Sequence, residues 1–126
     1  MRPALLRRGG PAELQRRIDA GELTPDRGPH RLDPRAGCVL VGARRPLVAF
    51  NVNLDSRDVE VARAVAAAVR EAGGGLPGVR ALGLALPRAG CVQVSMNIED
   101  WQAAPPHVVV ARVREEAARH GVEVLG

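Results

Sequence analysis

Uncharged polar side chains alternate with apolar ones in two stretches of this 126-residue chain. Asn51 and Asn53 lie two residues apart in the first stretch, and Gln93, Ser95 and Asn97 keep the same spacing in the second. Because successive side chains of a β-strand point to opposite faces, this spacing places each set on one face of its strand. A carboxamide both donates and accepts hydrogen bonds. The two sets therefore suit a neutral, amide-rich or heterocyclic ligand whose edge carries donors and acceptors.

Two other interpretations of these side chains remain open. The carboxamides hydrogen-bond to one another or to a second domain that covers the sheet, or the face is simply solvated. RNA binding is disfavoured, because sheets that bind single-stranded RNA stack bases on aromatic residues of their central strands. Phe50 has the opposite parity and Trp101 lies beyond the strand, so we expect no nucleic-acid partner.

Arginine and histidine add further candidates. Arg44 and Arg45 lie at a predicted hairpin turn. There the guanidinium group of Arg44 could bind a ligand carboxylate through two parallel hydrogen bonds, or Arg44 could act only as a solubilising surface residue. His107 falls in the opening turn of a predicted helix, where it contacts a substrate or helps to pack or cap the helix start. No Ser or Cys nucleophile lies near a base, and no carboxylate pair shares a strand face. We therefore predict no catalytic residue in this chain.

The two cysteines and a run of glycines have structural explanations. Cys38 and Cys91 each lie in a hydrophobic stretch, far apart in sequence, so we expect buried thiols in a reducing compartment and neither a disulfide nor a metal site. Residues 73–75 are all glycine, but they follow a predicted helix where a phosphate-binding loop would precede one. Their predicted role is to end that helix.

Composition indicates one small soluble domain with a basic leader. The chain contains 18 basic residues, all of them Arg, and 14 acidic residues, which gives a net charge of +4. Residues 1–36 hold eight of these arginines against five acids, a net +3, so the rest of the chain is nearly neutral. No apolar run approaches the roughly 20 residues that cross a bilayer, and the start lacks the apolar centre of a secretory signal. We expect a cytoplasmic protein without a membrane partner.

Local patterns predict the elements that must position these side chains. Residues 1–36 contain five of the ten prolines and are predicted to be a leader or linker with one short helix over 12–20. Beyond it, periodicity predicts a strand over 37–43 in a hairpin with a strand over 46–54, followed by a helix that is capped by Asp55 or Ser56 and ends before Gly73. Two strands over 79–86 and 91–98, joined by a tight turn, come next. A second helix from Pro105 or Pro106 to about His120 and a strand over 122–125 complete the predicted elements.

The order strand, helix, strand, strand, helix, strand from residue 47 onward is the split βαβ arrangement of ferredoxin-like domains. We therefore predict an α+β, ferredoxin-like sandwich over residues 37–126, with 37–43 as an additional N-terminal strand. In that fold the strands over 47–54 and 91–98 are central neighbours, so their polar faces combine in one patch and their apolar faces pack beneath the helices. The small residues Ala81, Gly83 and Ala85 are expected on the polar face, where they leave room for a flat ring.

Several segments resemble one enzyme family. The run Val41–Arg44 followed by Leu47–Leu54 resembles the C-terminal subdomain of the formiminotransferase domain of glutamate formimidoyltransferases. Other matching segments are Gly74–Gly83, Val92–Asn97, Pro25-Asp26, Gly28-Pro29, Pro106-His107, Glu116-Ala117 and Val122–Val124. The resemblance covers nearly the whole chain, with departures at Pro46, Ala85 and Ala111, which replace two aromatic residues and an acid.

The resemblance implies a folate-dependent enzyme of histidine degradation, which moves a formimino group from N-formimino-L-glutamate to tetrahydrofolate as co-substrate. In that family folate lies in a groove between the sheets of two α/β subdomains, and proton transfer belongs to a His of the N-terminal subdomain. Expected partners are such an N-terminal subdomain or a second copy through the open sheet face. The residues expected to bind folate or substrate are Arg44, Asn51, Asn53, Gln93, Ser95, Asn97 and His107. The alternative is a non-catalytic, stand-alone ferredoxin-like domain that binds a ligand or self-associates.

Overall fold

The chain divides into two compact units, Met1–Ala43 and Arg44–Gly126. The structure is a computed structural model that describes residues 3–125. Within that part of the chain, no helix combines the length and the apolar character that would let it span a membrane.

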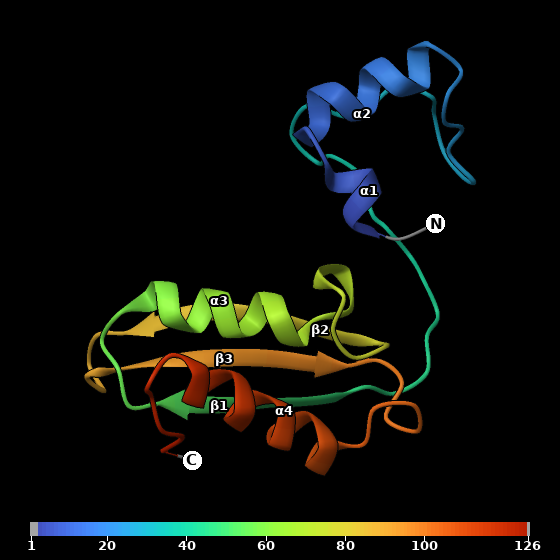
Figure 1. Cartoon of the computed structure of the whole chain (residues 1–126). Helices are drawn as coiled ribbons and strands as arrows, with labels where there is room; N and C mark the ends of the chain where they lie inside the picture. The colour runs from blue at the N-terminus through green and yellow to red at the C-terminus, as the bar shows by residue number, and fades with distance from the viewer. Residues whose placement is uncertain (1–2, 126) are drawn as a thin grey trace. The chain divides into compact units, whose positions relative to one another are not determined.

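The described part of the first unit contains the helices α1 (Pro3–Arg7) and α2 (Gly10–Asp19) (Figure 1). The helix expected over residues 12–20 is α2, and α1 precedes it. Leu14 and Ile18 lie one helical turn apart and are both buried. Gln15 ties the following loop to α2, because its Oε1 accepts from the Leu32 N–H at 2.7 Å and its Nε2 donates to the His30 carbonyl at 3.1 Å.

The prediction of an additional strand over residues 37–43 is wrong. Residues 38–43 are exposed and have no strand structure, and only an isolated bridge joins Gly37 to Asp33. The predicted hairpin is absent as well. Its predicted turn, Arg44-Arg45, contains none of the Gly, Asn or Asp residues that tight two-residue hairpin turns require. Apolar composition alone was therefore a poor guide to strand formation here.

The second unit is a mixed α/β layer structure with a three-stranded antiparallel sheet in the order β1-β3-β2 (Figure 1). Its elements are β1 (Val48–Leu54), α3 (Val59–Val69), the short 3₁₀ helix η1 (Glu71–Gly73), β2 (Val79–Leu86), β3 (Cys91–Ile98) and α4 (Pro106–Arg119). The predicted order of strands and helices from residue 47 to residue 120 is thus confirmed. The last predicted strand, over 122–125, is reduced to a single antiparallel bridge between Val124 and Leu54.

Helix α3 begins later than predicted. Its N-cap is Asp58, whose Oδ1 accepts from the Glu60 N–H at 2.9 Å, where Asp55 or Ser56 was expected. Asp55 is still held by the C-terminal segment, since its N–H donates to the Glu123 carbonyl at 2.9 Å. The Ser56 hydroxyl accepts from the Asp58 N–H at 3.1 Å and so supports the cap from outside.

Glycines turn the chain back sharply after α3. Gly74 has φ +83°, a left-handed conformation that other residues rarely adopt. A Cβ at Gly75 would lie 2.3 Å from the Val69 carbonyl oxygen, so the returning chain runs directly against the helix end. The prediction that this run ends the helix is only partly right: α3 already ends at Val69, because Arg70 is extended, and the glycines end the short helix η1 that follows.

Helices α3 and α4 cover one face of the sheet and enclose the core. Alternate strand residues point into this layer, as the parity of β1 and β3 predicted. The buried core residues include Val52, Leu54, Val92, Val94, Met96 and Ile98 from these strands, and Ala62, Val65, Ala66, Val69, Val109, Val113 and Ala117 from the helices.

Strand β2 turns its small residues toward the helices, contrary to prediction. Ala81, Gly83 and Ala85 pair with Met96, Val94 and Val92 of β3, whose side chains are buried. Directly paired residues of an antiparallel ladder share a face, so these small residues belong to the helix-covered side. A Cβ on Gly83 would lie 2.3 Å from the Arg63 backbone nitrogen. The small residues thus make room for α3 and not for a ligand.

This contact predicts that Gly83→Ala destabilises the second unit by roughly 1–3 kcal/mol, because the added methyl group meets helix backbone that cannot rotate away. Gly42→Ala is the matched control, since a Cβ there has no atom within 4 Å. Urea denaturation followed by circular dichroism measures both. Equal stability of the two variants would show that α3 does not depend on a glycine beneath it.

Candidate functional site

The polar face predicted from parity exists. The pairing of β1 with β3 sets Asn51 opposite Ser95 and Asn53 opposite Gln93, and Asn97 follows along β3 opposite Ala49. Neighbouring residues of these strands, such as Val52 and Val94, point into the core. The five polar side chains therefore share the sheet face that α3 and α4 leave open. Asn51 and Asn97 are exposed, whereas Asn53, Gln93 and Ser95 are half-buried.

One pair of carboxamides on this face is hydrogen-bonded. Gln93 Nε2 donates to Asn53 Oδ1 at 2.8 Å, across the two central strands. Within residues 3–125, no side-chain hydrogen bond involves Asn51, Ser95 or Asn97. Mutual bonding, one of the sequence-based alternatives, thus accounts for two of the five groups and leaves three with their full hydrogen-bonding capacity.

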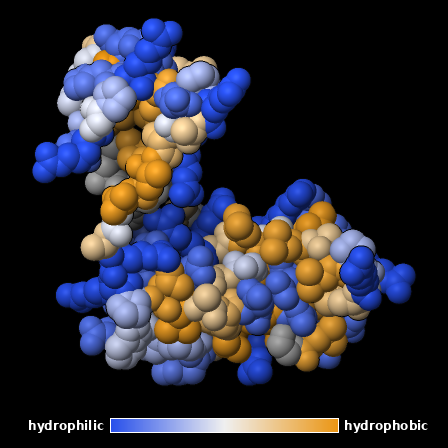
Figure 2. All heavy atoms as spheres, turned by 180° about the vertical axis from the view of Figure 1, so that it is seen from behind, coloured by the Kyte–Doolittle hydropathy of each residue, from blue (hydrophilic) through white to orange (hydrophobic). Residues whose placement is uncertain are grey.

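Leucines of β2 complete the open face. Leu82 pairs with Ser95 and Leu84 with Gln93, so both share the polar side of the sheet. Leu82 is 62% exposed and Leu84 is 41% exposed. Figure 2, which views the molecule from behind Figure 1, shows hydrophobic side chains interleaved with hydrophilic ones on the surface of the second unit. The open face is therefore partly apolar, and it is not the small-residue surface that was expected.

The C-terminal segment adds a third exposed leucine. The Leu125 N–H donates to the Asn53 carbonyl at 2.8 Å, beside the bridge between Val124 and Leu54. Val124 packs against the core, so the alternation of an extended chain turns Leu125 to the open face, where it is 58% exposed. None of the three leucines was predicted from the sequence to lie on this face. The β2 pair was detectable by continuing the pairing through the turn at residues 87–90.

An ion pair marks one end of the open face. Arg80 pairs with Asn97 in the sheet, and its Nε donates to Glu99 Oε1 at 2.5 Å. Both side chains are partly exposed, so each charge is balanced on the surface. The amides and the serine hydroxyl beside them do not titrate near neutral pH. This part of the face can therefore orient a ligand by hydrogen bonds but does not form a proton-transfer pair.

Arg44 and His107 do not belong to the strands that carry the polar face. Arg44 is exposed in the irregular segment before β1, because the predicted hairpin does not form. His107 is exposed at the second position of α4, a helix that packs on the covered side of the sheet. The structure thus brings together five of the seven sequence-based candidates and leaves these two outside the cluster.

The cysteines do not pair, and the expectation of two buried thiols is half right. Cys91 is buried and Cys38 is exposed, and both are free. Cys38 lies in the irregular segment that was expected to be a strand. Among residues 3–125, no group of three His, Cys, Asp or Glu side chains is arranged to hold a metal ion.

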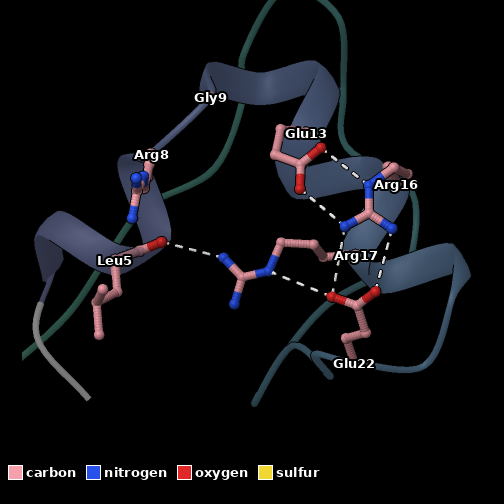
Figure 3. Close-up of a pocket in the computed structure, with 7 residues that line it drawn as sticks. All are labelled: Leu5, Arg8, Gly9, Glu13, Arg16, Arg17 and Glu22. Atoms are coloured by element: carbon pink, nitrogen blue, oxygen red, sulfur yellow. Dashed lines mark hydrogen bonds and ion pairs between the residues drawn. The ribbon is translucent and has the colours of Figure 1, made fainter.

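A separate hollow of about 660 Å³ lies in the first unit, between α1 and α2 (Figure 3). Its lining residues are Leu5, Arg8, Gly9, Glu13, Arg16, Arg17 and Glu22. Arg16 is held there by two acids, since its Nη2 lies 2.8 Å from Glu13 Oε1 and its Nη1 lies 3.1 Å from Glu22 Oε1. The hydrogen bonds from Arg16 lower the pKa of Glu13, and those from the two acids raise the pKa of Arg16. These charges mostly balance one another.

The lowered pKa of Glu13 predicts how this ion pair responds to acid. The pair is intact above the ordinary carboxyl pKa and is lost as the pH falls through the lower value of the folded chain. Removal of the cation in Arg16→Gln should therefore raise the Glu13 titration midpoint toward its usual 4.5, as measured by carboxyl ¹³C NMR. Arg8→Gln, which lines the same hollow, should leave the midpoint unchanged; an unchanged midpoint in Arg16→Gln would contradict the assignment.

Comparisons with known proteins identify the family. The family model of the formiminotransferase domain matches residues 49–126. The glutamate formimidoyltransferase of Streptococcus pyogenes serotype M1 is 36% identical over 123 residues, which cover 98% of this chain and 41% of that protein. Its counterpart from Thermoplasma acidophilum is 37% identical over 110 residues, covering 87% of this chain and 36% of that protein.

A longer relative gives the same result. The formimidoyltransferase-cyclodeaminase of Rattus norvegicus is 34% identical over 127 residues, covering 96% of this chain and 23% of that protein. The chain thus spans about two fifths or less of the length of these relatives. On the match over residues 49–126, which is more than half of the chain, this protein belongs to the formiminotransferase domain family.

Proposed function

We propose that this chain is the C-terminal half of a folate-dependent glutamate formimidoyltransferase and contributes binding of tetrahydrofolate and N-formimino-L-glutamate. The observation that carries the proposal is the amide-rich open sheet face in a chain of this family. The names of the relatives, glutamate formimidoyltransferase and formimidoyltransferase-cyclodeaminase, suggest the formimidoyl transfer and the glutamate. Folate as co-substrate, one-carbon metabolism, a place in histidine degradation and a cytoplasmic location are parts of this proposal.

The chemistry of the face fits a pteridine ring. A pterin edge alternates hydrogen-bond donors and acceptors, which carboxamides can match, and a flat ring gains by covering apolar surface. Asn51, Asn53, Gln93, Ser95 and Asn97 supply the polar contacts in the proposal, while Leu82 and Leu84 supply the apolar surface. Arg44 and His107 stay in the proposal as carboxylate and substrate contacts made from outside this face.

The catalytic acid or base is proposed to come from another polypeptide segment. The polar face contains neutral amides and a hydroxyl, and its Arg80–Glu99 pair is internally balanced. Proton transfer at neutral pH needs a group whose pKa lies near the working pH. An N-terminal formiminotransferase subdomain, facing the open sheet, is the proposed source and the proposed partner.

The ferredoxin-like fold is also a proposal. It is supported by the strand order β1-β3-β2 and by the bridge from Val124 to Leu54, which lies on the edge of β1 away from β3. A fourth strand at that edge would complete the split βαβ arrangement.

The exposed leucines favour a second candidate function. Leu82 and Leu84 are large apolar side chains that are exposed next to each other on the open face. Exposed apolar surface of this kind is typical of interaction sites. A non-catalytic domain that self-associates through its open face would cover them. In that case the polar residues would serve protein contacts and no folate would bind.

Calorimetric titration with tetrahydrofolate, with and without a co-expressed N-terminal half, tests the main proposal. Binding by the chain is expected, and formimino transfer is expected only when both halves are present. Asn51→Ala should weaken binding about tenfold, the effect of losing roughly 1.4 kcal/mol of hydrogen bonding, while thermal stability stays nearly unchanged because the side chain is exposed.

The same titration separates the two candidate functions. Absence of folate binding in both settings, together with a concentration-dependent dimer in sedimentation, would reject the folate proposal and favour self-association. A large loss of stability in Asn51→Ala with unchanged affinity would show that this amide supports the fold.

A further inference from the structure

The outer edge of strand β2 is open to another strand. Among residues 3–125, β2 pairs with β3 on one side, and no strand or isolated bridge lies along its other side. Between Arg80 and Ala85, no loop of the described chain bonds to the β2 backbone either. The pairing with β3 runs without a bulge from Val79 to Leu86. The outer edge therefore offers a row of backbone N–H and C=O groups with which a further strand could pair.

This edge has few of the features that protect exposed strands from pairing. Natural edge strands carry Lys or Pro, a bulge, or a charge that points inward. Within β2 the only charged residue is Arg80, and its Nε donates to Glu99, so the charge is balanced. The nearest proline is Pro87, directly after the strand, where it limits the edge to the residues before it. An apolar edge without such protection is a typical site of strand pairing.

The sequence of β2 is symmetric about its centre. Residues 81–85 are Ala-Leu-Gly-Leu-Ala, which reads the same in both directions. Two copies of one strand that pair in antiparallel fashion run in opposite directions, so a symmetric sequence matches itself. Centred on Gly83, such a pairing sets Leu82 opposite Leu84 of the second copy, and Ala81 opposite Ala85 of the second copy. A two-fold axis then closes the contact at two copies.

Both faces of the strand suit this pairing. On the open face, Leu82 and Leu84 are exposed in the single chain, and each would be covered by a leucine of the second copy. On the other face, the small residues of β2 offer no side chain that obstructs a neighbour. Helix α3 packs on β3 as well as on β2, so it is set back from the edge. Its exposed pair of Arg63 and Glu60 is neutral overall, so two copies of α3 would bring no net charge together.

We propose that two copies of this chain associate edge to edge through antiparallel pairing of their β2 strands, centred on Gly83. The two sheets then form one continuous sheet. The edge of a single strand buries less than the roughly 1,200 Å² of a stable interface, so the dimer forms in a concentration-dependent way. This contact uses the edge of the sheet and leaves the amides of the open face accessible. It therefore requires neither folate binding nor association through that face.

Sedimentation velocity of the 126-residue chain over a range of concentrations tests the pairing. The wild-type chain should shift reversibly from monomer to dimer as its concentration rises. Leu82→Lys and Leu84→Glu, each alone, should weaken the dimer at least about tenfold, because a charge then faces a leucine in both cross-strand pairs. An equimolar mixture of the two variants should recover association to within about threefold of wild type. In the mixed dimer the new lysine faces the new glutamate, and the two unchanged leucines face each other.

A matched control lies at the other edge of the sheet. Leu125 is also an exposed leucine, but its N–H bonds to Asn53 of β1. Leu125→Lys should therefore leave the dimer unchanged. Amide hydrogen exchange gives a measurement that needs no substitution, since exchange of residues 80–85 in the wild-type chain should slow as the dimer forms.

Three results would overturn the proposal. The first is a wild-type chain that stays monomeric at every concentration. The second is loss of the dimer in Leu125→Lys, which would place the contact on the open face. The third is a mixture that associates as weakly as its components although the circular dichroism of both variants matches wild type, since the pairing centred on Gly83 is the one that sets residues 82 and 84 opposite each other. None of these results involves folate, so this proposal and the proposed function succeed or fail separately.

Discussion

The register of β3 against its two neighbours is the constraint on which the rest of this molecule depends. Every residue of β3 pairs with one of β2, and most also pair with one of β1, so a one-residue slip would send Gln93 and Ser95 into the core and Val94 out of it. Burial of the β3 residues that face α3 and α4 excludes such a slip. The same burial that stabilises the sheet thus fixes which side chains meet on its open face.

Close packing of α3 on β2 follows from that register. Gly83 lies where a methyl group would meet the backbone of Arg63, so the strand needs a residue without a side chain at that point. Because side chains alternate, the small residues of β2 lie under the helix and Leu82 and Leu84 face outward. An exposed apolar stripe is therefore coupled to tight packing on the opposite side. This coupling gives the open face its mixture of amides and leucines.

That mixture bears on function more than any single side chain does. Amides supply hydrogen bonds with direction but no net charge, and leucines supply surface that a ligand or another domain gains by covering. Such a face can hold and orient a group while proton transfer comes from elsewhere. The division agrees with a chain that spans two fifths or less of the length of its relatives.

Sequence reasoning succeeded where the determining interactions are local. The bounds of β2 and β3, the end of α4 before Gly121, and the polar face of β1 and β3 follow from alternation, helical spacing and glycine conformation within short segments. It failed where the structure of a segment depends on contacts with residues that are distant in the sequence. The run over 37–43 is apolar enough for a strand but pairs with no other strand. The Asp55 N–H bonds to the Glu123 carbonyl, a contact distant in sequence, and the helix is capped three residues later by Asp58.

The candidate site divides in the same way. The shared face of the five polar side chains could be predicted without coordinates, because alternation is a property of each strand and the two strands are central neighbours in the expected order. The residues around them could not be predicted in this way, because they are placed by pairing between strands and by the C-terminal segment. The pairing of β2 with β3 turned Leu82 and Leu84 outward, the bridge at Val124 brought in Leu125, and Gln93 bonded to Asn53. Each of these depends on contacts between segments far apart in the chain, which no local pattern encodes.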